Sequence, residues 1–477
     1  LYNIYKTDFS QNGAAGKMVE YRHMTVNGAV NYAYDDRYVA TFSFAADGSD
    51  NYRPGNRWGF YPSLGLGWIV SRERFLRDSR TVDLLKLRAS VGKNGWDPMG
   101  EMRYLWEGYY TGRGGLNTGN SEHTWHGGTA LSYLPNPGIF AEKSLKYDAG
   151  IDLRLWNRLS LNVDLFLEKR SGIVTQDWMI PGASGVDNPP YRNIGRMTNK
   201  GFEVQLSWAD RIGDFNYALT GMASYNSNKV DYMAEVVTVP TAARTGRRLD
   251  ALFGYVADGF YDWDDFDVGG ELREGLPKPT FGAVQPGDIK YKNLNGDTVI
   301  DENDQTAIGD SYLPKLQYSF SLAASYKGFD LFALFQGAAG RDVNLLDAPL
   351  QNIAFRDNGN VYGIAEGRWA YYPEQGIDTR ATATYPRLSL QDNSNNYRNS
   401  TLWKRSGDFL KLRNVELGYT FAQPSLSKAG ISKIRIYLSG VNLLTVSRLM
   451  RDYDIDPEIL SGHPALKSYN LGLTVTF

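Results

Sequence analysis

The sequence contains no cysteine, only four histidines and no excess of either charge. Without cysteine, disulfide bonds and thiolate-bound metals are excluded. The histidines lie at positions 23, 123, 126 and 463, so a three-histidine zinc site would have to gather residues from distant segments. The 51 Lys and Arg residues nearly balance the 53 Asp and Glu residues, whereas a nucleic-acid-binding surface normally has a basic excess. We therefore expect no nucleic acid partner.

Long apolar runs are also missing. No stretch of about 18 apolar residues occurs, which excludes a transmembrane helix, and the mean hydropathy is −0.41. A transmembrane β-strand needs only about 9–11 residues, apolar toward lipid and polar toward the lumen, so its hydropathy averages out. Residues 1–12 are mixed and polar and do not resemble a signal peptide. Either a leader has been removed or the chain begins inside a larger protein.

Apolar and polar residues alternate with a period of two in many segments. In 147–155 the odd-numbered residues are Tyr, Ala, Ile, Leu and Leu, and the even-numbered residues are Asp, Gly, Asp and Arg. This pattern predicts strands with one apolar and one polar face. The expected strands are 17–34, 37–48, 57–71, 82–95, 142–156, 159–171, 199–210, 213–230, 312–326, 329–342, 405–421, 432–444 and 467–477.

The connections between these segments alternate in length. Short links at 35–37, 157–158, 210–213, 327–328 and 422–430 alternate with long, polar links at about 95–141, 171–198, 231–311, 343–404 and 446–465. Short turns on one rim and long loops on the other are typical of an outer-membrane barrel, with the short rim periplasmic. Aromatic residues at the strand ends, such as Tyr34 and Trp156, fit an interfacial girdle. We predict an all-β fold, a transmembrane antiparallel β-barrel.

The strand count is about 13, which is odd. Bacterial single-chain barrels have an even number of strands, and an open edge in lipid is not tolerated. Residues 1–477 are therefore expected to be the C-terminal portion of a larger, plugged barrel of about 22 strands. The plug domain and the N-terminal strands would lie outside this sequence. The alternative is a secreted β-sandwich or propeller, but strands in those folds are usually about 5–6 residues long.

Several motifs carry a family resemblance. They are LLKLRASVGKNG (84–95), RNIGRMTNKGFEVQLSW (192–208), GYVADGFY (254–261), GDIKYKNLNGDTVIDENDQTAIGDSYLPK (287–315), GRWAYYP (367–373), STLWKRSGDFLKLRNVELGYTF (400–421), IRIYLSGVNLLTVS (434–447), DPE (456–458) and the terminal YNLGLTVTF. Together they resemble the SusC/RagA-like TonB-dependent transporters of the Bacteroidetes outer membrane. The matching stretches run from near residue 17 to the C-terminus.

The resemblance implies a machine that imports nutrients across the outer membrane. It implies a SusD-like surface lipoprotein that covers the extracellular mouth, TonB acting through a plug segment missing here, contact with membrane lipid, and a dimer of transporter–lipoprotein pairs. The implied ligand is an oligosaccharide, with an oligopeptide as the alternative. Two other hypotheses remain open: a secreted or surface all-β glycan-active enzyme, and a siderophore receptor that works without a lid. No catalytic residue is identified, and the chain is not expected to be an enzyme.

One loop resembles calcium-binding loops. Oxygen ligands at loop positions 1, 3, 5, 7, 9 and 12 can surround a hard cation, and six residues fall at these offsets: Asn293, Asn295, Asp297, Val299 through its carbonyl, Asp301 and Asp304. Against a Ca²⁺ site, Asn replaces Asp at position 1, Thr298 occupies the usual glycine position, and Asp is shorter than Glu at position 12. The alternative is a turn ordered by its own hydrogen bonds.

Aromatic residues cluster in the long links. Flat rings with polar tips suit stacking on sugars or peptide side chains; the ligand-binding candidates are Trp106, Tyr109, Trp263, Trp369 and Tyr372. The alternative is packing within the loops or against a lid protein. Asp262, Asp264, Asp265 and Asp267 are crowded acids, but no base or nucleophile accompanies them, so solvated loop charge is the preferred interpretation.

Overall fold

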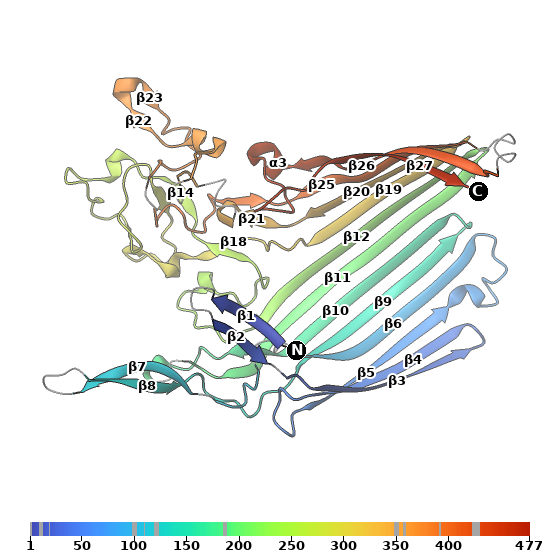
Figure 1. The fold of residues 1–477 in the computed structure, drawn as a ribbon, viewed down its shortest axis with the longest axis horizontal. Coiled ribbons are helices and arrows are strands. Elements are labelled where there is room, and N and C mark those ends of the chain that lie inside the picture. Colours follow the sequence, from blue (N-terminus) through green and yellow to red (C-terminus); the bar gives the residue numbers. More distant parts are fainter. Residues whose placement is uncertain are drawn as a thin grey trace.

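A single large antiparallel sheet dominates the fold (Figure 1). The computed structural model describes residues 2–8, 13–18, 20–97, 103–108, 110–118, 124–184, 188–347, 353–355, 359–390, 393–421 and 430–477. The sheet has 13 strands in the order β27-β26-β25-β20-β19-β12-β11-β10-β9-β6-β5-β4-β3. Each sheet strand therefore pairs with the sheet strands before and after it in the chain, as in an up-and-down barrel.

The sheet strands are long. They are β3 (His23–Tyr34), β4 (Tyr38–Ser49), β5 (Trp58–Ile69), β6 (Val82–Trp96), β9 (Glu142–Leu155), β10 (Leu159–Gln176), β11 (Tyr191–Ile212), β12 (Phe215–Tyr232), β19 (Leu316–Tyr326), β20 (Phe329–Ala339), β25 (Phe409–Phe421), β26 (Lys433–Ser447) and β27 (Ser468–Thr476). The expected 13 strands are confirmed.

The expected strand 17–34 is wrong at its start. Its sheet strand begins at His23, and Lys17 belongs to a separate hairpin of β1 (Tyr2–Asp8) and β2 (Gly13–Met18). β10 and β11 extend beyond the expected ends because Val174 and Gln176 pair with Asn193 and Tyr191 above the alternating region. In these two strands periodicity located the part with two unlike faces and missed the part that projects past it. The expected strands 312–326, 329–342 and 405–421 were instead too long at the loop rim, since β19 begins at Leu316, β20 ends at Ala339 and β25 begins at Phe409.

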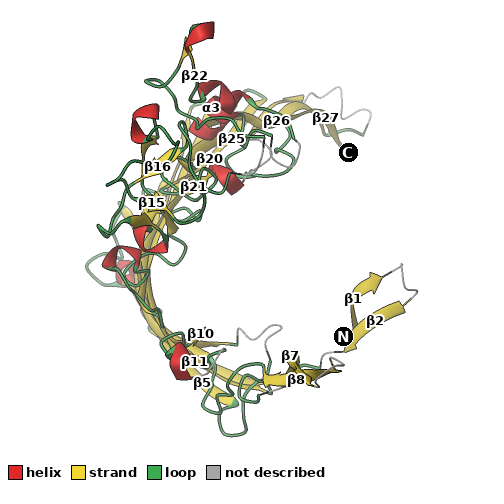
Figure 2. Ribbon diagram, turned by 90° about the vertical axis from the view of Figure 1, so that its left-hand side faces the viewer, coloured by secondary structure: helices red, strands yellow, loops and turns green. Residues whose placement is uncertain are grey.

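The sheet curls into an open arc, as the end-on view of Figure 2 shows. The two edge strands each have one sheet neighbour in the described part of the chain: β3 pairs with β4, and β27 pairs with β26. The segments 17–34 and 467–477 are therefore not hydrogen-bonded to each other, in agreement with the expectation of a larger barrel. An unpaired edge leaves backbone N–H and C=O groups that hydrocarbon cannot satisfy.

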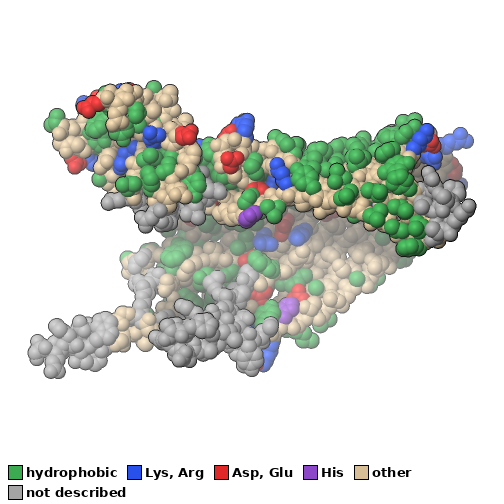
Figure 3. Space-filling model, turned by 45° about the horizontal axis from the view of Figure 1, so that its top comes forward, with side chains coloured by type: hydrophobic (Ala, Val, Ile, Leu, Met, Phe, Trp, Pro, Cys, Tyr) green, Lys and Arg blue, Asp and Glu red, His purple; other side chains and the backbone are tan. Residues whose placement is uncertain are grey.

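The strand register separates two faces of the sheet. Leu161 pairs with Leu153 and Leu206, and Asn162 pairs with Asp152 and Gln205. Directly opposed residues share a face, so each face is continued from strand to strand. The outer surface of the strands toward the C-terminus is densely apolar in Figure 3, and charged residues are visible on the concave side behind it. The expected assignment of apolar residues outward and polar residues inward is confirmed.

Short turns close one rim of the sheet. The turn at Lys327-Gly328 has φ values of 45° and 90°, the positive pair that a two-residue hairpin turn requires. Large, exposed aromatic side chains surround this rim: Tyr32, Tyr34, Tyr38, Trp68, Trp156, Phe215, Tyr326, Phe329 and Phe421. They form the girdle that anchors a barrel at the membrane interface.

The long links lie on the opposite rim, where most of them form a packed body and the hairpin of β7 and β8 projects away from it (Figure 1). The hairpin consists of β7 (Tyr110–Thr118) and β8 (Thr124–Leu131), and the packed body contains the strands β13 (Leu252–Gly254), β14 (Ala257–Phe260), β15 (Lys278–Pro279), β16 (Ile289–Tyr291), β17 (Val299–Ile300), β18 (Thr306–Gly309), β21 (Asp342–Asn344), β22 (Tyr371–Tyr372), β23 (Ile377–Asp378) and β24 (Lys404–Ser406), and the helix α3 (Arg448–Tyr453). The largest buried cluster lies here and includes Ile289, Ile300, Leu345, Trp403 and Leu449. A barrel wall faces lipid or lumen, so a conventional core can form only in the loops.

No helix in the described ranges is both long enough and apolar enough to cross a membrane.

Candidate functional site

The concave wall carries a hollow lined mainly by amides, hydroxyls and carboxylates. Its lining includes Asn162, Asp164, Glu203, Gln205, Ser224, Gln317, Ser319 and Gln336, from β10, β11, β12, β19 and β20. Glu203 pairs with Ser224, and Ser224 pairs with Gln317, so the hollow follows rows of directly opposed residues. Such a surface can donate hydrogen bonds to a polar ligand and accept them from it.

Two arginines form ion-pair clusters on this face. Arg88 Nε lies 3.0 Å from Asp152 Oδ2, and Arg88 Nη1 lies 2.8 Å from Asp164 Oδ1. Arg435 binds Asp330, and its Nη2 lies 2.6 Å from Glu416 Oε1. Both clusters place one guanidinium between two carboxylates of the polar wall.

Each cluster covers a glycine of the wall. A Cβ on Gly150 would lie 2.8 Å from Arg88 Cζ, and a Cβ on Gly418 would lie 2.6 Å from Arg435 Nη2. The guanidinium therefore crosses directly over the backbone at both glycines, and a larger residue there would have to displace it. The sequence pattern identified the faces of these strands but not these pairings.

The aromatic candidates fall into separate places. Trp263 and Tyr372 are more than half exposed. Arg380 connects their sequence neighbours: its guanidinium stacks 3.9 Å from the Tyr371 ring centroid, and its Nη1 lies 3.4 Å from Asp262 Oδ2.

The other aromatic candidates are less accessible. Trp369 is buried, and a Cβ on Gly287 would lie 2.5 Å from its ring. Trp106 is half-buried against the cluster of Tyr52, Leu105, Tyr133 and Ile139. Tyr109 lies outside the described residues. A role of the five in ligand binding stays a prediction.

The proposed calcium loop is held by hydrogen bonds within it. Asp304 is fully buried, and its two carboxylate oxygens accept from the amides of Leu294 and Asp301 at 2.7 and 2.9 Å. Asp297 Oδ1 accepts from the Val299 amide, and Asp297 Oδ2 accepts from Asn295 Nδ2.

These hydrogen bonds use carboxylate oxygens that a cation would need. Asn293 Oδ1 likewise accepts from the Gly296 amide, and the Asp301 carboxylate caps a short 3-10 turn at Asn303. Among the described residues, no group of three or more His, Cys, Asp or Glu side chains is arranged to hold a metal ion. This geometry fits the turn interpretation better than a calcium centre, and calcium binding stays a prediction.

The crowded acids of the same body have structural partners. Asp265 Oδ1 lies 3.1 Å from Lys290 Nζ, and the Asp267 carboxylate accepts from the amides of Gly269 and Glu271. Together with the Asp262–Arg380 pair, these contacts give three of the four acids a structural partner.

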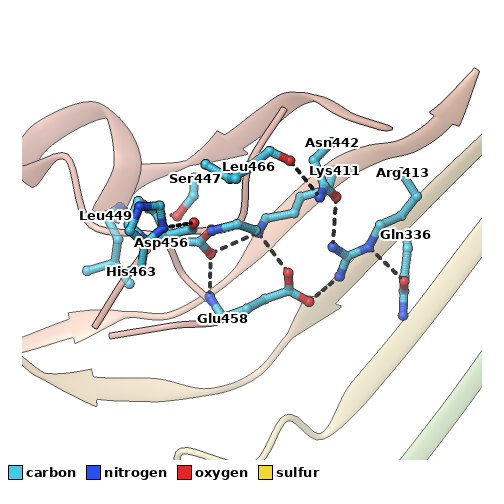
Figure 4. Close-up of polar contacts among 12 residues, drawn as sticks. Gln336, Lys411, Arg413, Asn442, Ser447, Leu449, Asp456, Glu458, His463 and Leu466 are labelled. Carbon is cyan, nitrogen blue, oxygen red and sulfur yellow. Dashed lines mark hydrogen bonds and ion pairs between the residues drawn. The ribbon is translucent and has the colours of Figure 1, made fainter. Parts of the chain in front are cut away.

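A buried ionic network, which the sequence motifs did not reveal, connects the last long loop to the wall. Figure 4 shows Lys411 of β25 between Asp456 and Glu458, at 2.8 and 2.7 Å from their carboxylates. Arg413 binds the other oxygen of Glu458 and also Asn442 and Gln336. Lys411 and Asp456 are almost completely buried.

The two carboxyls of this network remain ionised to a lower pH than usual, because the pKa of each is lowered. Burial raises the pKa of Asp456, but hydrogen bonds from Lys411 Nζ and the Glu458 amide outweigh it, so the pKa lies below its ordinary value. Burial likewise raises the pKa of Glu458, and Arg413 and Lys411 lower it further than burial raises it. The only sequence signal was that Lys411 and Asp456 both fall in motifs that carry the family resemblance.

Comparison with known proteins identifies the family. Residues 3–443 match the family described as TonB dependent receptor-like, beta-barrel. TonB-dependent receptor P26 of Formosa agariphila is 29% identical over 100% of this chain and 48% of its own length. TonB-dependent receptor SusC of Bacteroides thetaiotaomicron is 25% identical over 94% of this chain and 43% of its own length. The chain therefore spans about half the length of the curated relatives it matches.

A solved structure has the same fold. The RagAB peptide transporter superposes with a TM-score of 0.71 at 22% identity, over 99% of this chain and 49% of that chain. The similar curated proteins are receptors and not glycan-active enzymes. With its 13-stranded wall and its family match, the chain belongs to the TonB-dependent receptor-like β-barrel family of the outer membrane and is of the SusC/RagA type.

Proposed function

We propose that this chain provides wall strands and extracellular loops of an importer that moves oligomeric nutrients across the outer membrane, with energy supplied through TonB. The observation that carries the proposal is the polar concave wall, in which Glu203, Ser224 and Gln317 follow one another across adjacent strands. A continuous set of weak hydrogen-bonding positions allows a polar chain to bind and still move along the wall, because no single position holds it tightly. Family membership supports the mode of energy coupling.

An oligosaccharide is our preferred substrate. The wall hollow contains uncharged amides and hydroxyls, including Asn162, Gln317, Ser319 and Gln336, and these groups pair with sugar hydroxyls in either direction. The exposed Trp263 and Tyr372 supply faces on which sugar rings can stack. An oligopeptide is the alternative, because the structural neighbour with the same fold is described as a peptide transporter.

We propose a SusD-like surface lipoprotein as the lid over the loop body. The SusC/RagA type of the barrel supports this partner, and the exposed Trp263 and Tyr372 offer aromatic area for contact. We further propose that a plug segment and additional strands outside residues 1–477 close the barrel and connect it to TonB. The one-sided pairing of β3 and β27 supports this arrangement.

Uptake by intact cells tests the proposal. Cells that carry the complete transporter should accumulate a fluorescent oligosaccharide, and a protonophore that removes the energy supply should abolish accumulation. Gln317→Ala with Gln336→Ala should lower uptake because both amides line the wall. The matched control is Leu322→Ala, which changes the lipid-facing side of β19. Uptake of a labelled peptide instead of the oligosaccharide would reassign the substrate, and uptake of neither would refute import of oligomers.

A further inference from the structure

Six basic residues gather on the outward, lipid-facing side of five adjacent strands. We define them together as the basic patch: Lys93 of β6, Lys143 of β9, Lys169 of β10, Arg196 and Lys200 of β11, and Lys229 of β12. The strand register aligns three of them. Leu145 opposes both Lys93 and Lys169, and Thr198 opposes both Lys169 and Lys229. The three lysines therefore lie in one row across the wall.

The other three cations lie in the rows directly above and below this row. Lys143 and Arg196 both oppose Ser171, two residues above Lys169, and Lys200 opposes Leu167, two residues below it. Successive strands are about 4.8 Å apart, and a two-residue step along a strand is about 7 Å. The patch is therefore small enough for one anionic headgroup to contact several of its members.

The height of the basic patch coincides with the outer edge of the apolar band. Lys169 shares a face with Leu165 and Leu167, and it lies ten residues beyond Leu159, where β10 leaves the short-turn rim. At about 3.3 Å per residue and a tilt of about 40°, this separation is roughly 25 Å, the height of the apolar band of an outer-membrane barrel. The patch therefore lies where the headgroups of the outer leaflet begin.

None of the six forms an ion pair with another described residue, although wall cations on the concave side such as Arg88 do. Two of the six are oriented by aromatic rings: Lys143 Nζ lies 4.4 Å from the Phe140 ring centroid, and the Arg196 guanidinium lies 5.4 Å from that of Tyr232.

One acid is close to the basic patch. Asp231 accepts a hydrogen bond from Thr198 Oγ1 at 2.5 Å. A single carboxylate cannot balance six cations, so the patch has a strong local excess of positive charge.

The clustering does not continue onto the neighbouring strands β5, β4 and β3. Pro62 of β5 is adjacent to Ser63, which pairs with Gly92 of β6, so Pro62 lies at the level of Lys93. Phe44 of β4 opposes Pro62, and Gly28 of β3 opposes Phe44, so these three residues are the outward positions at this level. The next outward row on those strands is Val26, Ala46 and Phe60. If these side chains only extended their charged groups from the lipid-facing wall toward water, they would not need to lie together on five neighbouring strands.

From this charge complementarity we propose that the basic patch binds the phosphorylated headgroup of a glycolipid in the outer leaflet. Ammonium and guanidinium groups at a membrane surface recognise phosphate through charge-assisted hydrogen bonds, and the apolar rows below the patch would contact the acyl chains. This inference rests on the outer-membrane location of the barrel and does not depend on the imported substrate.

Native mass spectrometry of the complete transporter, purified in a neutral detergent, tests the inference. The probe is diphosphorylated lipid A, compared with the same lipid after removal of its phosphates. The triple variant Lys93→Gln, Lys169→Gln, Lys229→Gln should bind diphosphorylated lipid A at least about tenfold more weakly than the wild type. The triple Lys→Arg variant at these positions should bind within about twofold of the wild type, because the charge is retained.

The matched control removes the same number of charges from the concave side. Lys86→Gln, Lys146→Gln, Arg154→Gln alters residues that oppose Asp152, Glu168 and Ser160 and should bind the lipid as the wild type does. Heat-resistant migration of each barrel in detergent gels checks assembly. If the triple variant does not assemble, each single Lys→Gln change should still weaken binding by about twofold or more.

Three results would overturn the inference. The first is unchanged affinity of the assembled Lys→Gln variants. The second is equal binding of the phosphate-free lipid, which would leave only acyl-chain contact. The third is complete displacement of the lipid by inorganic phosphate, which would reassign the patch to a free-anion site.

Discussion

Lys411 Nζ lies 2.8 Å from Asp456 Oδ1, and both side chains are almost completely buried although 45 residues separate them. Asp456 also accepts from the amides of Glu458 and Ala465. One ion pair therefore fixes the segment between α3 and β27 against the inner side of β25. This relationship makes the last long loop part of the wall and not an independent surface loop.

Removing one partner of this pair should release the loop. A buried ion pair broken on one side costs about 3–5 kcal/mol because the remaining charge is left uncompensated. Lys411→Met should therefore increase proteolytic cleavage within 448–467 by at least about 100-fold, since each 1.4 kcal/mol corresponds to a factor of about ten. Asp452→Asn is the control: it breaks the exposed Arg451–Asp452 pair and should change the rate by less than about twofold. Equal rates in both variants would contradict the role of Lys411.

Acid should loosen the same segment. The pKa values of Asp456 and Glu458 lie below their ordinary values of 3.8 and 4.5. A carboxyl with a lowered pKa in the folded state contributes stability that is complete above its unfolded-state pKa and is lost as the pH falls through the folded-state pKa. Hydrogen exchange of 454–467, corrected for intrinsic rates, should be constant from pH 7 to about 5 and should accelerate below about 4. The Lys411→Met, Asp456→Asn double variant should show a smaller acceleration, because only Glu458 with its partner Arg413 then remains, and an identical profile in both proteins would reject the prediction.

The two faces of β10 should differ in their tolerance of charge. Leu165→Arg places a cation against lipid near the middle of the apolar band, at a cost of about 2–4 kcal/mol. Asn162→Arg places it on the polar wall, beside Asp152 and Gln205. The amount of heat-resistant barrel in outer membranes should fall for Leu165→Arg and remain near the wild-type amount for Asn162→Arg. Equal amounts of both variants would reject the assignment of the faces.

The loop 293–304 distinguishes a metal site from a turn. Asp304→Ala removes the acceptor of two backbone amides and should destabilise the loop by about 1–3 kcal/mol whether or not calcium is present. Under the turn interpretation, calorimetry of the wild-type protein detects no calcium binding, and hydrogen exchange of 293–304 is the same with a chelator. A binding heat that Asp297→Ala abolishes would establish the cation site instead.

Residues 1–477 should not close a barrel without further strands. Among the residues that the structure describes, β27 and β3 each leave one edge unpaired, and each unsatisfied backbone group in hydrocarbon costs several kcal/mol. Expressed by itself, the chain should yield no heat-resistant barrel, whereas the complete transporter should. A stable barrel formed from residues 1–477, with β27 bonded to β3, would contradict both the strand count and the expected larger architecture.

The sequence by itself determined the faces and number of the wall strands. Alternation along residues such as Leu161, Asn162 and Val163 is a local property, because a strand places successive side chains on opposite faces whatever its partners are. The lengths of the links indicated which rim is periplasmic and which is extracellular. The predicted start of β3 was wrong because the alternating signal continues through Lys17 into a different hairpin. Local periodicity does not specify which strand pairs with which.

Only the tertiary structure decided what the side chains meet. Arg88 and Asp164 are 76 residues apart, and Lys411 and Asp456 are 45 apart, so no local spacing indicates either pair. The basic patch is equally invisible along the chain, because its six members lie on five strands and are aligned only by the register. Trp263 and Trp369 looked alike in sequence, but Trp263 is exposed and Trp369 is buried. Burial and pairing depend on how the long loops and the sheet are brought together, and that arrangement is set by packing between segments far apart in sequence.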